Sequence, residues 1–492
     1  MRQPLRSLRS TVWLGLALTI SFFYPLLVTL YDQARYLQWT RVNTWELISA
    51  IALGAVGGAI TLRFIDRIER TVPRILALLA VMSVPLMSFG VHALRQLRFT
   101  DTLIGTHEWV TRHGVVSLVM GLAAVLVISL LVRRWLSAVE RVLWGALLFL
   151  SLLTFFAALT IARVWPFDTQ TTIAAVPAAT AREGGHMLLF LFDELSYEYL
   201  YDANGNVRDM FPNFQRFAAS ATNYHRARAP GRRTLRSVPG YLRGEPVGRI
   251  TVAGDEIFEL GSDGEQHPLT FTGEHLFARA RALGYTTAIV GPAFQYCVLL
   301  ASSLDRCWSY STYNYAGIHS SFSVWNPVAT TMILWPRQLP QGWVKRPLYA
   351  HWQRRGIAEV TAFVRDVIRA PSPAFLFAHV YLPHLPFAFD RNGYAPAENP
   401  FEQSPENYTR QLAYVDTWFG EVLATLDAQG RFSSSTIVVL SDHNFRAQTP
   451  SDEWDHVPFI VKGADQREHG DIDVPTRIEE ALSALVSASS PQ

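Results

Sequence analysis

The chain has 492 residues, of which 49% are hydrophobic and 17% are charged, and its formal net charge is +2. This length and apolar content exceed the needs of one ordinary domain, so we expect more than one. The nearly neutral charge argues against a nucleic-acid partner, as does the lack of a basic sequence stretch interleaved with aromatic residues.

Five apolar stretches in the first 162 residues are long enough, or nearly so, to cross a membrane. A helix rises about 1.5 Å per residue, so about 20 residues cross a hydrocarbon core of about 30 Å. The predicted spans are 12–31, 47–62, 75–94, 115–132 and 142–161, the second being the shortest. Because four further spans follow the first, a signal peptide is a poor interpretation of the start. We therefore predict a transmembrane anchor domain over residues 1–162.

Arginine is unevenly distributed among the loops of this anchor. Ten arginines precede the first span or lie in the loops between spans two and three and between spans four and five, whereas the other two loops contain five. Cytoplasmic loops carry the excess of basic residues, which predicts a cytoplasmic N-terminus in the inner membrane. An odd number of spans then places the chain from residue 163 onward in the periplasm or another extracytoplasmic space.

The two cysteines, Cys297 and Cys307, both lie in the part of the chain that is predicted to be outside. A pair ten positions apart in an oxidising compartment favours a small disulfide loop. Two unrelated buried thiols are the alternative.

The outer part of the chain alternates short apolar runs with amphipathic stretches. Residues 163–185 are rich in Ala, Thr and Pro and are predicted to be a linker, followed by a catalytic domain over residues 186–492. Helical patterns cover residues 273–285 and 408–430. This alternation predicts an α/β domain with a mainly parallel sheet covered by helices on both faces. The predicted strands are 187–192, 286–291, 374–382, 436–441 and 457–463.

Acidic residues and a histidine follow two of these strands. Asp193 and Glu194 end the first strand, and Asp442 and His443 end a much later one. Parallel strands bring their carboxyl ends to one edge of a sheet, where ligands bind. Any one of these acids could lie in a solvated surface turn, but together they suit one or two divalent cations, Zn²⁺ or Mn²⁺ being the best fits.

A threonine among arginines is the candidate nucleophile. Thr234 is surrounded by Arg232, Arg233 and Arg236. A bound cation can activate a hydroxyl, and arginines can bind a phosphate or sulfate through charge-assisted hydrogen bonds. The alternative is a helix-capping threonine beside ordinary surface arginines.

Three histidines follow or precede apolar strands. His379 lies within a predicted strand, so we expect it to be a structural residue. His384, between two prolines just past that strand, is the better candidate for a general acid or a substrate contact. His456 stands directly before another strand and is a candidate for substrate or second-metal binding, with a surface turn as the alternative.

These motifs together resemble the sulfatase-like branch of the alkaline phosphatase superfamily. They are "LFDELS", "TLRSVP", "LPHLPF", "VVLSDH" and "HVPFIVKG", which occur in the order of that family across residues 186–465. The preceding anchor resembles the membrane-anchored phosphoethanolamine and phosphoglycerol transferases, including lipoteichoic acid synthase-like enzymes. The chain lacks the C/S-x-P-S/A-R motif of true sulfatases within residues 231–240.

The resemblance implies a role for each matched residue. Asp193, Glu194, Asp442 and His443 would bind the metal, Thr234 would be the nucleophile and a metal ligand, and His384 and His456 would contact the substituent and the leaving group. The implied reaction transfers a phospho-substituent from a membrane lipid donor to an envelope glycan or lipid acceptor. Two alternatives remain, namely an extracytoplasmic phosphodiesterase or sulfuric ester hydrolase and a catalytically silent glycan-binding envelope protein.

Overall fold

The computed structural model describes residues 8–96, 136–165, 184–261, 263–312, 314–315, 322–334 and 342–488. The chain divides into two compact units. The helical unit contains Met1–Asp168 and Tyr313–Leu348, and the sheet unit contains Thr169–Thr312 and Tyr349–Gln492. The predicted catalytic range 186–492 thus contains a segment, 313–348, that clusters with the predicted anchor.

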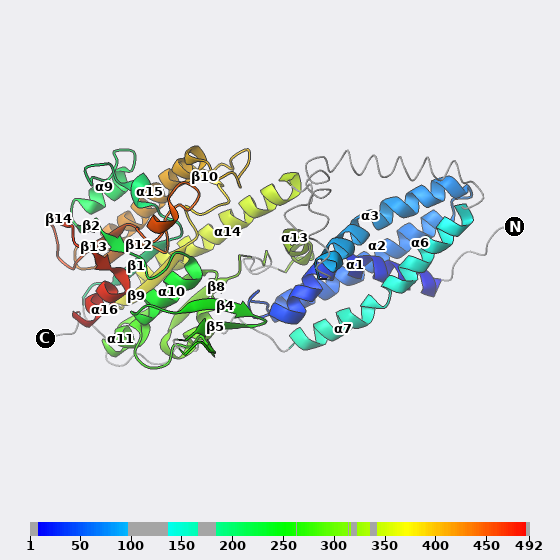
Figure 1. Ribbon diagram of the computed structural model, residues 1–492, viewed down its shortest axis with the longest axis horizontal. Coiled ribbons are helices and arrows are strands. Elements are labelled where there is room, and N and C mark those ends of the chain that lie inside the picture. The colour runs from blue at the N-terminus through cyan, green and yellow to red at the C-terminus, as the bar shows by residue number, and fades with distance from the viewer. Residues whose placement is uncertain are drawn as a thin grey trace. The chain divides into compact units, whose positions relative to one another are not determined.

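The helical unit holds three helical stretches that are long and apolar enough to cross a membrane, Arg9–Gln33, Arg41–Asp66 and Leu136–Val164. The first, second, third and fifth predicted spans are helical, whereas the fourth, 115–132, and residues 166–183 of the predicted linker lie outside the described residues. The prediction of five spans is therefore borne out only for three membrane-length helices. The helices that lie wholly in this unit, among the described residues, are α1 (Leu8–Gln33), α2 (Arg41–Asp66), α3 (Thr71–Gln96), α6 (Leu136–Leu150), α7 (Leu153–Val164) and α13 (Trp325–Leu334) (Figure 1).

The sheet unit is built on an eight-stranded sheet whose strand order is β14-β2-β13-β12-β1-β9-β7-β8. The central strand β1 is parallel to β12 and β9, and β7 is parallel to β9 and β8. Strand β13 runs antiparallel to both of its neighbours, so the sheet is mixed and mostly parallel. The strands are β1 (Met187–Phe192), β2 (Thr222–Tyr224), β7 (Thr286–Pro292), β8 (Arg306–Tyr310), β9 (Ala374–Val380), β12 (Thr436–Ser441), β13 (Phe459–Lys462) and β14 (Gly470–Ile472).

Helices cover both faces of this sheet (Figure 1). Leu189 and Leu191 of β1 belong to a core cluster with side chains of α10 (Thr234–Arg243), α11 (Leu276–Ala282) and α16 (Ile478–Ala488). Phe190 and Phe192 of the same strand make edge-to-face contacts on the other face with Trp418 and Phe419 of α15 (Pro405–Ala428). Because successive side chains point to opposite faces, burial on both faces requires the continuous apolar run of β1.

Shorter elements complete the described fold. Three small sheets pair β3 (Ala227–Arg228) with β15 (Thr476–Arg477), β10 (Phe389–Asp390) with β11 (Gly393–Tyr394), and β4 (Arg249–Ala253) with β5 (Glu256–Leu260) and β6 (Gln266–Pro268). The remaining α-helices are α8 (Tyr197–Leu200), α9 (Pro212–Ala218), α12 (Tyr296–Leu299) and α14 (Gly342–Arg369). For the site, the important consequence is that β1, β9 and β12 are parallel neighbours whose carboxyl ends meet at one edge.

Candidate metal centre

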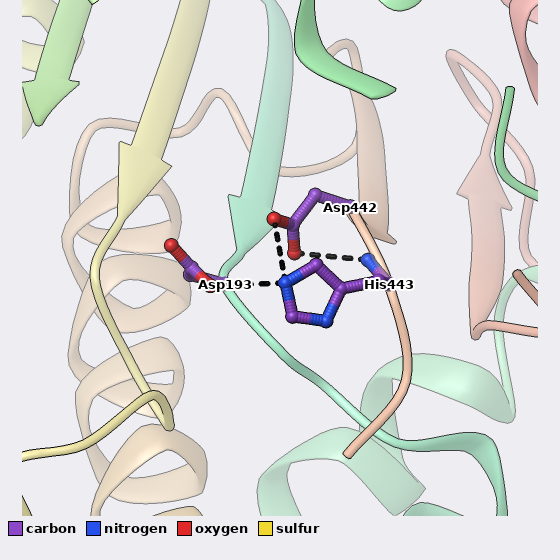
Figure 2. A group of neighbouring side chains, drawn as sticks. All are labelled: Asp193, Asp442 and His443. Atoms are coloured by element: carbon purple, nitrogen blue, oxygen red, sulfur yellow. Dashed lines mark hydrogen bonds and ion pairs between the residues drawn. The ribbon is translucent and has the colours of Figure 1, made fainter. Parts of the chain in front are cut away.

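Three buried side chains meet at the carboxyl ends of β1 and β12. Asp193 directly follows β1, and Asp442 and His443 directly follow β12 (Figure 2). One ligand atom from each of them lies within 4.8 Å of the others. His443 Nε2 is 3.3 Å from Asp442 Oδ2 and 3.8 Å from Asp193 Oδ1. The ends of β1 and β12 therefore bring these three residues together at one edge of the sheet, as the sequence predicted.

Thr234 of α10 joins this group through a hydrogen bond to Asp442. It is the first residue of α10, and its hydroxyl donates to Asp442 Oδ2 at 2.5 Å. The helix-capping alternative is wrong, because the N-cap residue is Arg233 and makes no side-chain cap bond. The hydroxyl consequently lies at the amino end of a helix, where the helix dipole favours a bound anion.

The backbone of Glu194 orients Asp442. Glu194 N–H donates to Asp442 Oδ1 at 2.9 Å, and His443 N–H donates to the same oxygen at 3.0 Å. Glu194 has a φ of 68°, a left-handed conformation that costs a non-glycine residue about 1 kcal/mol. Its own carboxylate lies near Arg446, with Oε1 3.4 Å from the backbone N and 3.6 Å from Nε. The backbone N–H of Glu194 thus holds Asp442 in place. The role of the Glu194 carboxylate as a metal ligand stays a prediction.

His379 belongs to the site, although we expected a structural histidine. Its Nε2 lies 3.4 Å from Asp193 Oδ2, and its Nδ1 is hydrogen-bonded to the Tyr296 hydroxyl at 2.8 Å. The expectation of a structural histidine considered β9 by itself and did not include this contact with Asp193. His379 is paired in register with Leu191, two residues before Asp193 on the adjacent strand β1. Its place next to the end of a second parallel strand was the signal that could have identified it.

His384 lies beside Asp193, as its place after β9 suggested. Its backbone N–H donates to the Asp193 carbonyl at 3.1 Å, and its ring Nδ1 donates to the Leu385 carbonyl at 2.7 Å. Burial lowers the pKa of His384, but the carboxylates of Asp193 and Glu194 outweigh it, and the pKa is raised.

The side chains of His456, Arg232 and Arg233 make their contacts elsewhere or face solvent. His456 Nε2 donates to the His225 carbonyl at 2.9 Å, and its Nδ1 lies 3.6 Å from Glu198 Oε1. Arg232 Nε is 3.7 Å from Asp455, and Arg233 is exposed. The substrate-binding roles predicted for these three residues stay predictions.

The donor atoms of this group fit a divalent cation. Four buried atoms have no hydrogen-bond partner, namely Asp193 Oδ1, Glu194 Oε2, His379 Nε2 and His443 Nε2. Burial raises the pKa of Asp193, but His384, His379 and His443 together lower it below its usual range, so the carboxylate is ionised. Buried polar atoms without partners are costly, and a cation that accepts oxygen and nitrogen ligands would satisfy several of them at once. Zn²⁺ and Mn²⁺ both suit this donor set.

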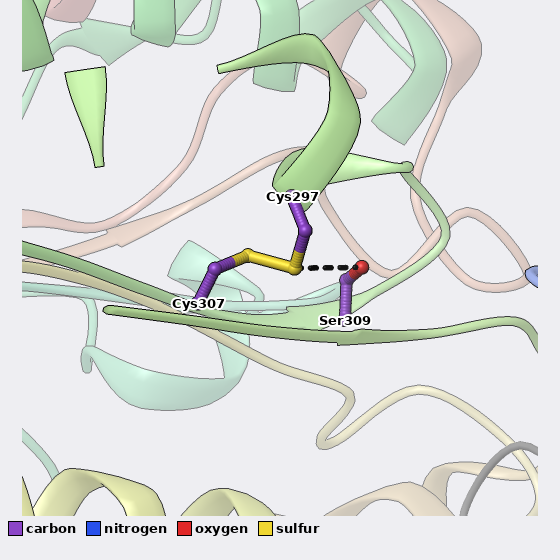
Figure 3. The surroundings of a disulfide bond; sticks show 3 residues. All are labelled: Cys297, Cys307 and Ser309. Atoms are coloured by element: carbon purple, nitrogen blue, oxygen red, sulfur yellow. Dashed lines mark hydrogen bonds between the residues drawn. A yellow bond between two sulfur atoms is a disulfide. The ribbon is translucent and has the colours of Figure 1, made fainter. Parts of the chain in front are cut away.

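The predicted disulfide is confirmed. Cys297 of α12 and Cys307 of β8 are bonded, and the Ser309 hydroxyl lies 3.4 Å from Cys297 Sγ (Figure 3). The bond ties α12 to the sheet. Because Tyr296 precedes Cys297 on this helix, the disulfide also restrains the tyrosine that contacts His379.

Residues 186–487, which are more than half of the chain, match the sulfatase family. The chain belongs to this family. Its matched region contains every member of the buried group, so the sheet unit carries a sulfatase domain of the hydrolase and transferase type. Among curated proteins, none matches the chain.

Several solved structures are distantly similar to the sulfatase domain. A phosphonate monoester hydrolase of Agrobacterium radiobacter is 13% identical, with a TM-score of 0.41 over 62% of this chain and 73% of that chain. A protein in the alkaline phosphatase superfamily from Vibrio parahaemolyticus is 14% identical, with a TM-score of 0.41 over 66% and 71%. The C-terminal periplasmic domain of EcEptC from Escherichia coli, in complex with Zn, is 11% identical, with a TM-score of 0.40 over 64% and 84%. Likenesses at this level carry no conclusion about substrate.

Proposed function

We propose that this protein is a membrane-anchored, metal-dependent phosphotransferase that uses Thr234 as its nucleophile. The proposed donor is a membrane lipid with a phosphoethanolamine or phosphoglycerol head group, and the acceptor is an envelope glycan or lipid. The observation that supports it best is the 2.5 Å hydrogen bond from the Thr234 hydroxyl to Asp442, inside the buried group of Asp193, Asp442 and His443.

Asp193, Asp442 and His443 would hold the cation. When bound, a divalent cation supplies Lewis acidity that eases ionisation of a hydroxyl and offsets the charge of a phosphoryl group. The residues of the chain do the remaining work of positioning. The Asp442 carboxylate directs the Thr234 oxygen, and the backbone N–H groups of Glu194 and His443 hold that carboxylate in place.

In the proposed first step, Thr234 Oγ1 forms a bond to phosphorus while the bond from phosphorus to the leaving alcohol breaks. The hydroxyl proton passes to Asp442 Oδ2, the oxygen to which the hydroxyl already donates a hydrogen bond. His384 gives a proton to the leaving oxygen. In the second step the acceptor hydroxyl attacks the phospho-threonine and loses its proton to His384, and Thr234 regains its proton from Asp442.

Two features of the chain support phosphate rather than sulfate and a membrane donor. Residues 231–240 contain no cysteine and no C/S-x-P-S/A-R motif, so the modified nucleophile of true sulfatases cannot form there. The three membrane-length helices would keep the site near lipid head groups. The arginine distribution supports a cytoplasmic N-terminus and a periplasmic sulfatase domain, and the disulfide is consistent with an oxidising compartment.

Substitution of the proposed nucleophile tests this function. We expect Thr234→Ala to lower hydrolysis of bis-p-nitrophenyl phosphate by about three orders of magnitude or more, because the attacking oxygen is lost. Metal content, measured by mass spectrometry of the purified full chain, should stay near the wild-type value. Thr234→Ser should retain part of the activity, and Thr270→Ala, at an exposed position, should be neutral. Undiminished activity of Thr234→Ala would refute the nucleophile assignment.

Product analysis separates transfer from hydrolysis. With a phosphoethanolamine or phosphoglycerol lipid as donor, a transferase forms a modified acceptor only when a glycan or lipid acceptor is added. A phosphodiesterase releases the head group to water at the same rate with and without the acceptor. A wild-type protein that binds no divalent metal and turns over neither substrate would instead be the catalytically silent alternative.

A further inference from the structure

The helical unit contains a buried carboxylate that the proposed reaction does not use. Glu46 lies in α2, a membrane-length helix, and is 1% exposed. Fully buried acidic residues are rare and need hydrogen-bond or charge partners. Glu46 accepts three hydrogen bonds, from Asn43 Nδ2 at 3.2 Å, from Ser323 N at 2.9 Å and from Asn326 Nδ2 at 2.6 Å. Two of these three donors lie far away in the sequence.

The distant donors belong to a segment that packs on α1 and α2 of the same unit. Val324, Val328 and Leu334 pack against a core cluster formed mainly by residues of α1, α2 and the loop between them. A further polar contact lies nearby, since Asn314 Nδ2 donates to the Leu37 carbonyl at 3.0 Å. The docked segment, residues 322–334, therefore combines an apolar surface with hydrogen bonds that determine its register.

The docked segment is an insertion in the chain of the sulfatase domain. Residues 313–348 belong to the helical unit, whereas the chain on either side of them belongs to the sulfatase domain. The predicted topology places the loop between the first two spans, just before Glu46, on the same side of the membrane as residue 163 onward. The docked segment can thus reach Glu46 without crossing the membrane.

We propose that residues 322–334 are a latch by which the sulfatase domain binds its own membrane anchor, with Glu46 as the docking residue. The latch holds the two parts together even when the linker 163–185 is cut. Loss of either partner leaves a buried polar group without its bond, so disruption of the pair weakens the attachment strongly. The proposal does not depend on the substrate of the enzyme.

The test uses the full chain in detergent, with an affinity tag at the N-terminus and a protease recognition sequence placed within residues 166–183. After cleavage, we measure the fraction of the C-terminal fragment that elutes with the tagged anchor. The wild-type fragment should be retained. Glu46→Leu and Asn326→Leu should each lower the retained fraction at least tenfold, while Glu46→Gln, which keeps an acceptor for Ser323 and Asn326, should retain the fragment.

The matched control is Trp325→Leu, which changes the half-exposed side chain next to Asn326. It should retain the fragment like the wild type. Each variant is first checked before cleavage for a monodisperse profile. Release of the wild-type fragment on cleavage would overturn the proposal, as would full retention in both leucine variants.

A cysteine cross-link provides a second, independent measurement in native membranes. Both native cysteines are joined in the disulfide, so introduced thiols react without competition. Mild oxidation is applied before the linker is cut, while the chain still joins the two parts. The pair Glu46→Cys and Asn326→Cys should then form a disulfide that keeps the two fragments together after cleavage. The control pair Glu46→Cys and Trp325→Cys should cross-link at least tenfold less. Equal yields from the two pairs, or failure of the first pair to cross-link, would contradict the latch.

Discussion

Tyr296 is hydrogen-bonded to a histidine that lies beside the candidate metal centre, and is therefore a positioning residue. Its hydroxyl lies 2.8 Å from His379 Nδ1, and His379 Nε2 lies 3.4 Å from Asp193 Oδ2. Burial, and to a smaller extent the charge of Asp193, raises the pKa of Tyr296 well above its ordinary value, so the hydroxyl keeps its proton. A protonated hydroxyl at Nδ1 determines the orientation of the imidazole ring, as groups behind metal-binding histidines commonly do.

We expect Tyr296→Phe to lower kcat about tenfold to a hundredfold with little change in KM, because the imidazole loses its orienting bond. The kinetics are measured with a soluble phosphodiester. Thermal stability and metal content, measured in parallel, should remain near the wild-type values. If kcat is unchanged, Tyr296 does not act through His379. If stability and kcat fall together, its role is structural only.

At the scale of elements, α1 and α2 approach each other closely because glycines line their contact. A Cβ added to Gly15 of α1 would lie 2.6 Å from the backbone N of Ala59, and one added to Gly58 of α2 would lie 3.0 Å from Gly15 Cα. Gly54 and Gly58 are four residues apart, the spacing by which small residues permit close packing of membrane helices. Gly57 differs, since an added Cβ would meet no atom within 4 Å.

Gly15→Ala should therefore destabilise the helical unit by about 1–3 kcal/mol, because the new methyl group meets backbone atoms that cannot move aside easily. Gly57→Ala is the matched control and should be neutral or slightly stabilising, since alanine is the better helix former. The two variants are compared by heating the full chain in detergent and measuring how much monodisperse protein remains at each temperature. Equal midpoints for both variants would show that the close contact does not limit stability.

At the scale of the whole sulfatase domain, His186 connects elements from three parts of the chain. Its Nδ1 accepts from Ala374 N–H at the start of β9, and its Nε2 donates to the Ile368 carbonyl near the end of α14. Its backbone carbonyl accepts from Thr436 N–H at the start of β12. Burial, followed by the charge of Arg431, lowers the pKa of His186 from 6.5 to about 4.

This lowered pKa makes the domain sensitive to acid. Between pH 6.5 and about 4 the unfolded chain binds this proton and the folded domain does not, so stability falls as the pH falls through this window. Across the whole window, the free energy of unfolding falls by about 3 kcal/mol because of this one histidine. We expect the midpoint of thermal unfolding to drop more from pH 7.5 to pH 5 in the wild type than in His186→Asn, which cannot be protonated. Parallel curves for the two proteins would contradict this assignment.

Much of the secondary structure could be read from local patterns. The runs 187–192 and 436–441 are β1 and β12 with the same bounds, because burial on both faces requires continuous apolar residues. The predicted helices 273–285 and 408–430 correspond to α11 and α15, with ends that differ by a few residues. The antiparallel direction of β13 was not predicted, because an apolar run carries no information about the direction of its neighbours.

The amino-acid sequence by itself determined which segments are apolar enough to span a membrane or form buried strands, and which strand ends carry acids. These are properties of consecutive residues. Only the tertiary structure placed His379 against Asp193, put His456 beside His225 and Glu198, and brought residues 322–334 back to Glu46. Such contacts depend on which strands become neighbours and on the path of the loops, and these are decided by packing across the whole chain rather than by any local pattern.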